Sequence, residues 1–157
     1  LILYCVSFKN KSFINNLLKM EHSFTKEEIN VIQDTFKKVQ FTDCWKLLYE
    51  KLFELDPGSA KLFKGDIEDQ QHRIMSMMKT VSEGLNNPNI ILPAIQDLGK
   101  RHADYGIDEK QYETFKTALF YALKTIAGNE WNEQTEKTWD KFYQILVAVM
   151  NSNVYKG

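Results

Sequence analysis

Histidine is the side chain with the widest chemistry in this sequence, which has three histidines, His22, His72 and His102. His102 lies in the stretch LGKRHADYGI, one helical turn after Leu98, so a helix would place its imidazole on an apolar stripe. A neutral imidazole that faces a core can hold a metal ion. An exposed histidine near a helix end, favoured by the helix dipole, is the alternative, and from this stretch alone it is the better interpretation. The surrounding elements must decide between the two.

Composition narrows the classes of function. The chain has 20 Lys and Arg against 21 Asp and Glu, a formal net charge of −1, and both signs are scattered along it. This pattern indicates solvated helix faces and gives no electrostatic case for nucleic-acid binding. Only two cysteines, Cys5 and Cys44, occur, and they lie far apart in sequence. A disulfide framework or a thiolate metal site is therefore not expected.

The first 23 residues differ from the rest. The apolar run Leu1 to Phe8 is shorter than a membrane span and has no basic region before it, as a signal peptide would have. We therefore expect no membrane span, a cytoplasmic location and a mobile N-terminal extension over residues 1–23. A helix or anchor that packs on the domain or on a membrane is the alternative, because apolar residues recur there at helical spacing at Phe13, Ile14, Leu17 and Leu18.

Helical periodicity dominates the remaining chain. Thr25 with Glu28, and Asp108 with Gln111, are predicted to cap helices, as are Asp56 and Asn132. Gly128 is expected to end a helix. No segment has strand periodicity. The sequence thus predicts an all-α single domain over residues 24–151 with a tail at 152–157. Its helices are expected at about 26–39, 43–55, 65–85, 91–105, 108–126 and from 132 through 149, with a short helix from 57 to 63.

From Thr25 to about Asn151 the chain resembles a globin. The most specific stretches are LYEKLFELDPGSAKLF and LGKRHADYGI, which are similar to those of neuroglobin-like globins, bacterial single-domain globins and flavohaemoglobins. LNNPNIILPAIQDLGKRH is especially close to the flavohaemoglobin pattern. The resemblance implies a globin fold of about seven to eight helices around a b-type haem. Covalent attachment of a c-type haem is not expected, because no CxxCH motif is present.

The resemblance also implies the proximal side of the haem. The position of His102 is that of the histidine that binds the iron, and a neutral imidazole on an apolar stripe suits that role. Phe63 matches the phenylalanine that packs on the haem plane, although a core aromatic residue would show the same pattern. The side chains expected to pack on the proximal side are Leu98, Ile107 and Phe115.

Along the ungapped match to flavohaemoglobins, the resemblance implies that the distal position is Gln70, with Ile74 one turn later closing the pocket. Tyr49 matches the tyrosine of the second helix that points at the bound gas. This Tyr and Gln pair resembles flavohaemoglobins and departs from the distal histidine of myoglobin. Both side chains can donate hydrogen bonds, so high oxygen affinity and slow oxygen release are expected. The alternatives are a solvent-facing Gln70 and a Tyr49 that is a core residue bonded to the backbone.

The distal register is less constrained than the proximal one. A shift by one or two residues would offer Gln71 or His72 in place of Gln70, and a rotated helix would let His72 bind the iron and make the haem six-coordinate. A solvated His72 is the favoured interpretation. Arg73 is expected to meet a haem propionate, since a guanidinium suits a carboxylate, with a solvated arginine as the alternative. Met77 is expected to line the haem site as soft packing.

The resemblance favours reversible binding of oxygen or another diatomic gas such as nitric oxide or carbon monoxide, with sulfide as a further ligand. Nitric oxide dioxygenase activity and a six-coordinate redox or gas sensor are the alternatives. The chain ends at Gly157 without a flavin and nicotinamide reductase, so turnover would need an external reductase. Tyr112 matches the proximal tyrosine of flavohaemoglobins, but the partner glutamate would fall near Val154, where no acid is present. Ligand binding is therefore favoured over catalysis.

Overall fold

The computed structural model of the chain describes residues 22–152, and these residues are all-α, as the periodicity predicts. The expected mobile extension lies outside the described residues up to residue 21, as do Val154 and most of the C-terminal tail. Two 3₁₀ helices, η1 and η2, accompany the α-helices. The elements are α2 (Lys26–Val39), α3 (Cys44–Leu55), η1 (Pro57–Leu62), α4 (Ile67–Gly84), α5 (Pro88–Asp104), α6 (Glu109–Ala127), η2 (Gly128–Glu130) and α7 (Glu133–Asn151).

Side-chain caps at three of the helix starts confirm the sequence-based expectation. The hydroxyl of Thr25 accepts a hydrogen bond from the backbone N–H of Glu28, whose carboxylate accepts from the N–H of Thr25 in return. Asp108 and Gln111 form the same reciprocal pair at the start of α6. The Asn132 side chain caps α7. These bonds satisfy N–H groups that the helix itself leaves without partners.

Two helix starts differ from the prediction. α5 begins at Pro88 and not near residue 91, because a proline at the first helical position loses no hydrogen bond and already has a helical φ. The carboxylate of Asp56 makes no capping bond to η1. Instead, the main-chain carbonyl of Asp56 accepts a hydrogen bond of 2.7 Å from the hydroxyl of Ser59 at the start of η1.

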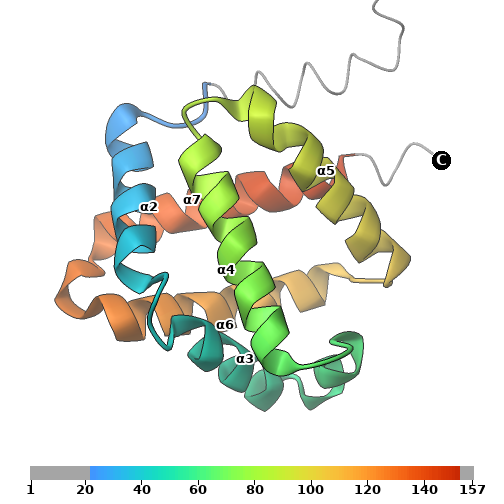
Figure 1. Cartoon of the computed structure of the whole chain (residues 1–157). Helices are drawn as coiled ribbons and strands as arrows, with labels where there is room; N and C mark the ends of the chain where they lie inside the picture. Colours follow the sequence, from blue (N-terminus) through green and yellow to red (C-terminus); the bar gives the residue numbers. More distant parts are fainter. Residues whose placement is uncertain (1–21, 153–157) are drawn as a thin grey trace, which may run out of the picture.

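The helices pack as two long seams with a third layer across them. α3 lies along α6, and α5 lies along α7. α2 contacts both α6 and α7, while α4 crosses in front of them in Figure 1 and contacts α2, α3 and α5. The core between these helices is apolar, and its largest fully buried side chain is that of Trp139 on α7. This arrangement brings the second half of α5 and the start of α6 against α7, which positions the candidate site.

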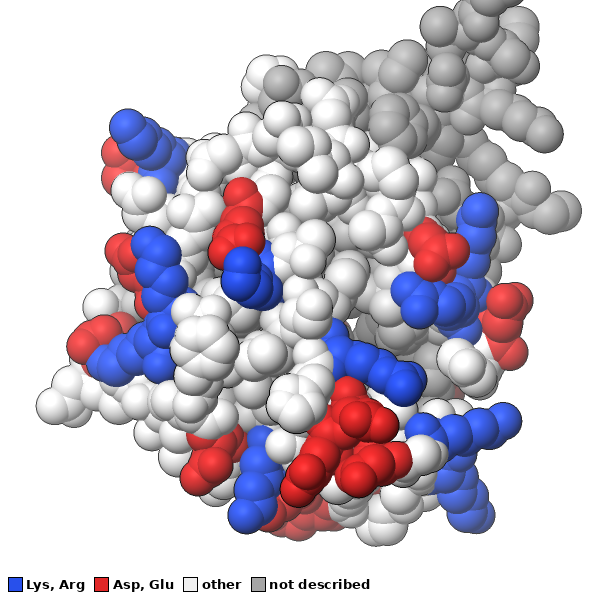
Figure 2. Space-filling model, viewed as in Figure 1, with Lys and Arg blue, Asp and Glu red and all other residues white. Residues whose placement is uncertain are grey.

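The surface carries both signs of charge in mixture. Figure 2 shows lysine and arginine interspersed with aspartate and glutamate on the visible face, as the scattered sequence pattern predicts. Many of these charges form ion pairs one helical turn apart, such as Lys79 with Glu83 at 2.6 Å. Among the helices that the structure describes, none has the length and apolar character needed to cross a membrane.

Candidate functional site

His102 lies in the last turn of α5 with its ring half-buried. The Nδ1 atom is 2.9 Å from the main-chain carbonyl oxygen of Leu98, which fixes Nδ1 as the protonated nitrogen. Burial lowers the pKa of the imidazole, the hydrogen bond to Leu98 opposes that shift, and the Arg101 charge adds to it. The ring is therefore neutral at pH 7, and Nε2, which has no partner among residues 22–152, keeps a free lone pair. This is the protonation state that a metal requires of histidine.

Tyr112 of α6 covers one face of that imidazole. The two ring centroids are 6.1 Å apart and the ring planes differ by 13°. The hydroxyl of Tyr143, on α7, donates a hydrogen bond of 2.7 Å to the main-chain carbonyl of Tyr112. Burial raises the pKa of both tyrosines, so both hydroxyls stay protonated at neutral pH. Three helices therefore meet at the histidine.

Gly99 brings α5 against the end of α7. It is buried three residues before His102. A Cβ atom at this position would lie 2.1 Å from the main-chain oxygen of Met150 and 2.7 Å from its carbonyl carbon. No side chain larger than hydrogen fits there without moving one of the helices. The distance between α5 and α7 near His102 is thus set by a contact between their backbones.

The expected distal tyrosine, Tyr49, lies on α3 within an aromatic cluster. It is 4% exposed and makes an edge-to-face contact with Phe63, at 5.2 Å between centroids. Phe53 contacts both rings. Burial raises the Tyr49 pKa to about 12, against an opposing effect of Arg73. The hydroxyl donates to the main-chain carbonyl of Gln70 at 3.4 Å, the far limit of a hydrogen bond.

The side chains at the start of α4 separate into two groups. Gln70 and Gln71 are half-buried, whereas His72 and Arg73 are exposed. The amide of Gln70 donates to the main-chain carbonyl of Lys64 at 2.9 Å and so has one N–H left to donate. His72 therefore faces solvent, and the half-buried face of α4 continues with Ile74.

The apolar side chains expected around a haem share one property, since all of them are only half-buried, and all except Ile107 pack against the buried core. They come from the segment between η1 and α4, from α4, from α5, from the segment before α6, and from α6. A flat, mostly apolar cofactor such as haem would cover side chains of this kind, and the neutral imidazole with its free Nε2 would supply a ligand to its iron. These residues therefore fit a haem. They are Phe63, Ile74, Met77, Leu98, Ile107 and Phe115.

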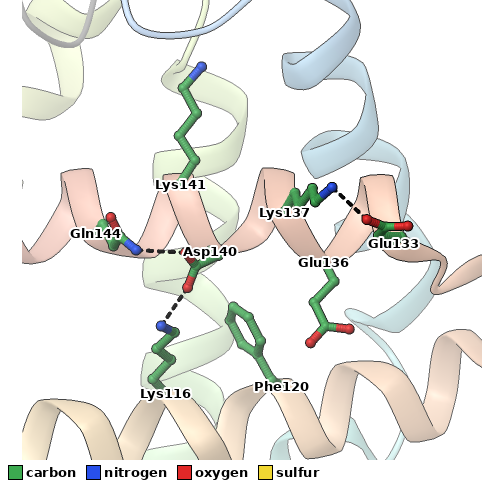
Figure 3. Close-up of a pocket in the computed structure, with 8 residues that line it drawn as sticks. All are labelled: Lys116, Phe120, Glu133, Glu136, Lys137, Asp140, Lys141 and Gln144. Atoms are coloured by element: carbon green, nitrogen blue, oxygen red, sulfur yellow. Dashed lines mark hydrogen bonds and ion pairs between the residues drawn. The ribbon is translucent and has the colours of Figure 1, made fainter.

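A surface hollow lies between α6 and α7. None of the residues predicted from the sequence lines it. Figure 3 shows Lys116 paired with Asp140, and Lys137 paired with Glu133. Glu136 accepts from the indole of Trp131 at 3.2 Å. Because its charges already have partners, the hollow offers no free chemical group, and residues 22–152 hold no group of three or more His, Cys, Asp or Glu side chains placed to bind a metal.

Two residues that shape the site, Tyr143 and Gly99, were not among those predicted from the sequence. Tyr143 looked like one of several core residues of the last helix, and its contact with Tyr112 spans 31 residues. Gly99 did carry a signal, since a glycine inside a helix costs about 1 kcal/mol relative to alanine and often marks a close approach of backbones. The partner in that approach, Met150, could not be read from the sequence.

Known proteins show which family the chain belongs to. The Globin family model matches residues 46–150. A flavohaemoprotein of Xylella fastidiosa is 24% identical over 136 residues, which cover 83% of this chain but 34% of that protein. The chain thus spans about a third of the length of this relative. Neuroglobin-1 of Oncorhynchus mykiss is 24% identical over 67% of this chain and 75% of its own. Globin CTT-Y of Chironomus thummi piger is 27% identical over 82% and 78%. The chain belongs to the globin family, which supports haem-based gas binding in general.

Proposed function

We propose that this globin binds b-type haem through Nε2 of His102 and reversibly binds oxygen or another diatomic gas on the opposite side. The observation that carries the proposal is the state of His102, whose ring is neutral, oriented by the carbonyl of Leu98 at 2.9 Å, and free at Nε2. A surface histidine that only caps a helix would not be covered by a tyrosine ring from another helix.

Ferrous haem would supply the bond to the gas, and the chain would supply selective hydrogen bonds. Tyr49 is suited to this because its hydroxyl is protonated and held only by a 3.4 Å contact to the carbonyl of Gln70. If the Tyr49 hydroxyl rotated toward a stronger acceptor, it would therefore give up only this weak hydrogen bond. A net gain of about 0.5–1.5 kcal/mol per hydrogen bond corresponds to roughly a twofold to twelvefold higher affinity.

The remaining side chains would contact either the bound gas or the cofactor. Gln70 would donate its second amide N–H to the gas, while its first stays on the carbonyl of Lys64. Arg73, which is exposed near Tyr49, would meet a propionate at the haem edge. The half-buried apolar side chains would cover the two faces of the ring, and they are Phe63, Ile74, Met77, Leu98, Ile107 and Phe115.

Absorption spectra test the proposal. The purified chain with haem is measured in the ferric state, after dithionite reduction, and after addition of oxygen. A five-coordinate ferrous spectrum that converts to a stable oxygenated form is expected. His102→Gly should lose that spectrum and recover it with added imidazole, whereas His72→Gly, the matched control, should leave it unchanged. A six-coordinate ferrous spectrum that disappears in His72→Gly would refute the distal assignment and support a sensor or electron-transfer role.

Nitric oxide dioxygenation is the second candidate, and the stacking of Tyr112 on His102 favours it, because the resemblance to flavohaemoglobins places a tyrosine there. Nitric oxide, oxygen and one electron give nitrate, so an external reductase would supply the electron. Rapid nitrate formation at the expense of a reduced flavoprotein would support the enzyme. Slow autoxidation of the oxygenated protein, with little nitrate formed per electron, would support the carrier.

A further inference from the structure

α7 contacts the surroundings of His102 at two separate points. Its Met150 main chain lies against Gly99, three residues before the histidine, and its Tyr143 side chain reaches the residue that stacks on the imidazole. The first contact fixes the distance between α5 and α7. The second fixes the first turn of α6, from which the Tyr112 ring extends.

We propose that Tyr143 is a positioning residue, which sets the orientation of the His102 ring through Tyr112. The inference rests on the proposed role of His102 as the haem ligand. Tyr143 is 7% exposed and its hydroxyl bonds to the main chain of Tyr112, so its effect passes through that main chain and then through the stacked rings.

The hydrogen bond of Tyr143 is suited to this task. The side chain is 7% exposed, and its hydroxyl lies 2.7 Å from the carbonyl oxygen of Tyr112. A carbonyl oxygen has two lone pairs, so the tyrosine can use one while the helix uses the other. Because the bond ends on the backbone, it restrains the position of the whole residue and not merely one rotamer of its side chain.

The imidazole is then restrained twice. The Leu98 carbonyl holds Nδ1 from within α5, which leaves rotation of the ring plane about that bond as the remaining freedom. The Tyr112 ring, parallel to within 13°, limits that rotation from α6. Loss of the Tyr143 hydroxyl would loosen the second restraint and leave the first intact. The expected result is a broader range of ring orientations without loss of the ligand.

Tyr143→Phe removes only the hydroxyl, and Tyr121→Phe is the matched control, since Tyr121 lies on α6 with an exposed ring. The iron–histidine stretching band of the ferrous protein is recorded by resonance Raman spectroscopy, together with the rate of haem loss to an excess of a haem-free acceptor. Tyr143→Phe should shift and broaden the band and speed haem loss about tenfold, the low end of what loss of an outer-shell partner costs. Tyr121→Phe should match wild type.

A second measurement separates this inference from the proposed function. In the haem-free protein, nuclear Overhauser effects between the ring protons of His102 and Tyr112 report the stack directly. Tyr143→Phe should weaken them, with the fold retained by circular dichroism. Wild-type protein that takes up no haem would defeat the proposed function alone. A Tyr143→Phe protein with wild-type Overhauser effects, or with wild-type band and haem loss, would overturn the positioning role.

Discussion

Gly99→Ala is the most direct perturbation of the site, because it adds one methyl group where α5 meets α7. The new Cβ would lie 2.1 Å from the Met150 carbonyl oxygen, so the two main chains must separate by about 1 Å to reach ordinary van der Waals contact. The obstacle is backbone and has no rotamer to change. Overpacking of this kind costs about 1–3 kcal/mol, and alanine returns about 1 kcal/mol through helix propensity. We expect a net loss of about 1 kcal/mol, with about 2 kcal/mol as the upper end.

Urea unfolding of the haem-free protein, followed by circular dichroism, measures this loss as a lower midpoint with an unchanged slope. Gly58→Ala is the matched control, since its Cβ would meet only the side-chain carboxylate of Asp56, at 3.2 Å, and no backbone. Its midpoint should stay within about 0.5 kcal/mol of wild type. A Gly99→Ala midpoint equal to or above that of wild type would refute the close approach of the two backbones.

Three further expectations concern Glu28, Cys44 and Tyr49. Burial alone would raise the Glu28 pKa, but hydrogen bonds from Lys141 and Thr25 and the Lys141 charge bring it below 4.5, so the pair stabilises the fold above that pH and the effect is lost as pH falls through the lowered value. Lys141→Met should therefore cost about 0.5–1 kcal/mol at pH 7, and unfolding midpoints should converge with wild type below pH 4.5; a constant difference would contradict this. Cys44, whose pKa burial raises to about 12, should resist thiol reagents at pH 8 in a Cys5→Ser background until urea unfolds the chain, and prompt labelling of the native protein would disprove its burial. Tyr49→Phe should speed oxygen release about tenfold in flash photolysis, and an unchanged rate would remove Tyr49 from the distal side.

The sequence predicted those features that depend on a few neighbouring residues. The capping pairs of Thr25 with Glu28 and of Asp108 with Gln111 each span three residues, and both occur as expected. The start of α5 at Pro88 was missed because the periodic apolar pattern begins only at Ile91, whereas the proline itself opens the helix. Neighbouring residues are thus enough to predict that a helix forms, whereas its first residue depends on which group caps the helix.

The candidate site was only partly accessible in the same way. Spacing alone placed His102 on the stripe of Leu98, and the resemblance to globins supplied its role and that of Tyr49. Contacts between distant segments were beyond reach, because periodicity gives the face of a helix but not its partner. The bond from Tyr143 to Tyr112 and the approach of Gly99 to Met150 are of this kind.

The acceptor that orients His102 has a consequence for how this site tolerates evolutionary change. The carbonyl of residue 98 belongs to the main chain, so any residue that continues the helix supplies it, whatever its side chain. Substitutions at Leu98 can therefore alter packing and haem retention while the tautomer of the imidazole is inherited unchanged. Where a side-chain carboxylate orients the imidazole, a single substitution of that residue removes the acceptor. Here the control is lost only with the histidine itself or with the helix that carries it, so it does not depend on which side chain stands at position 98.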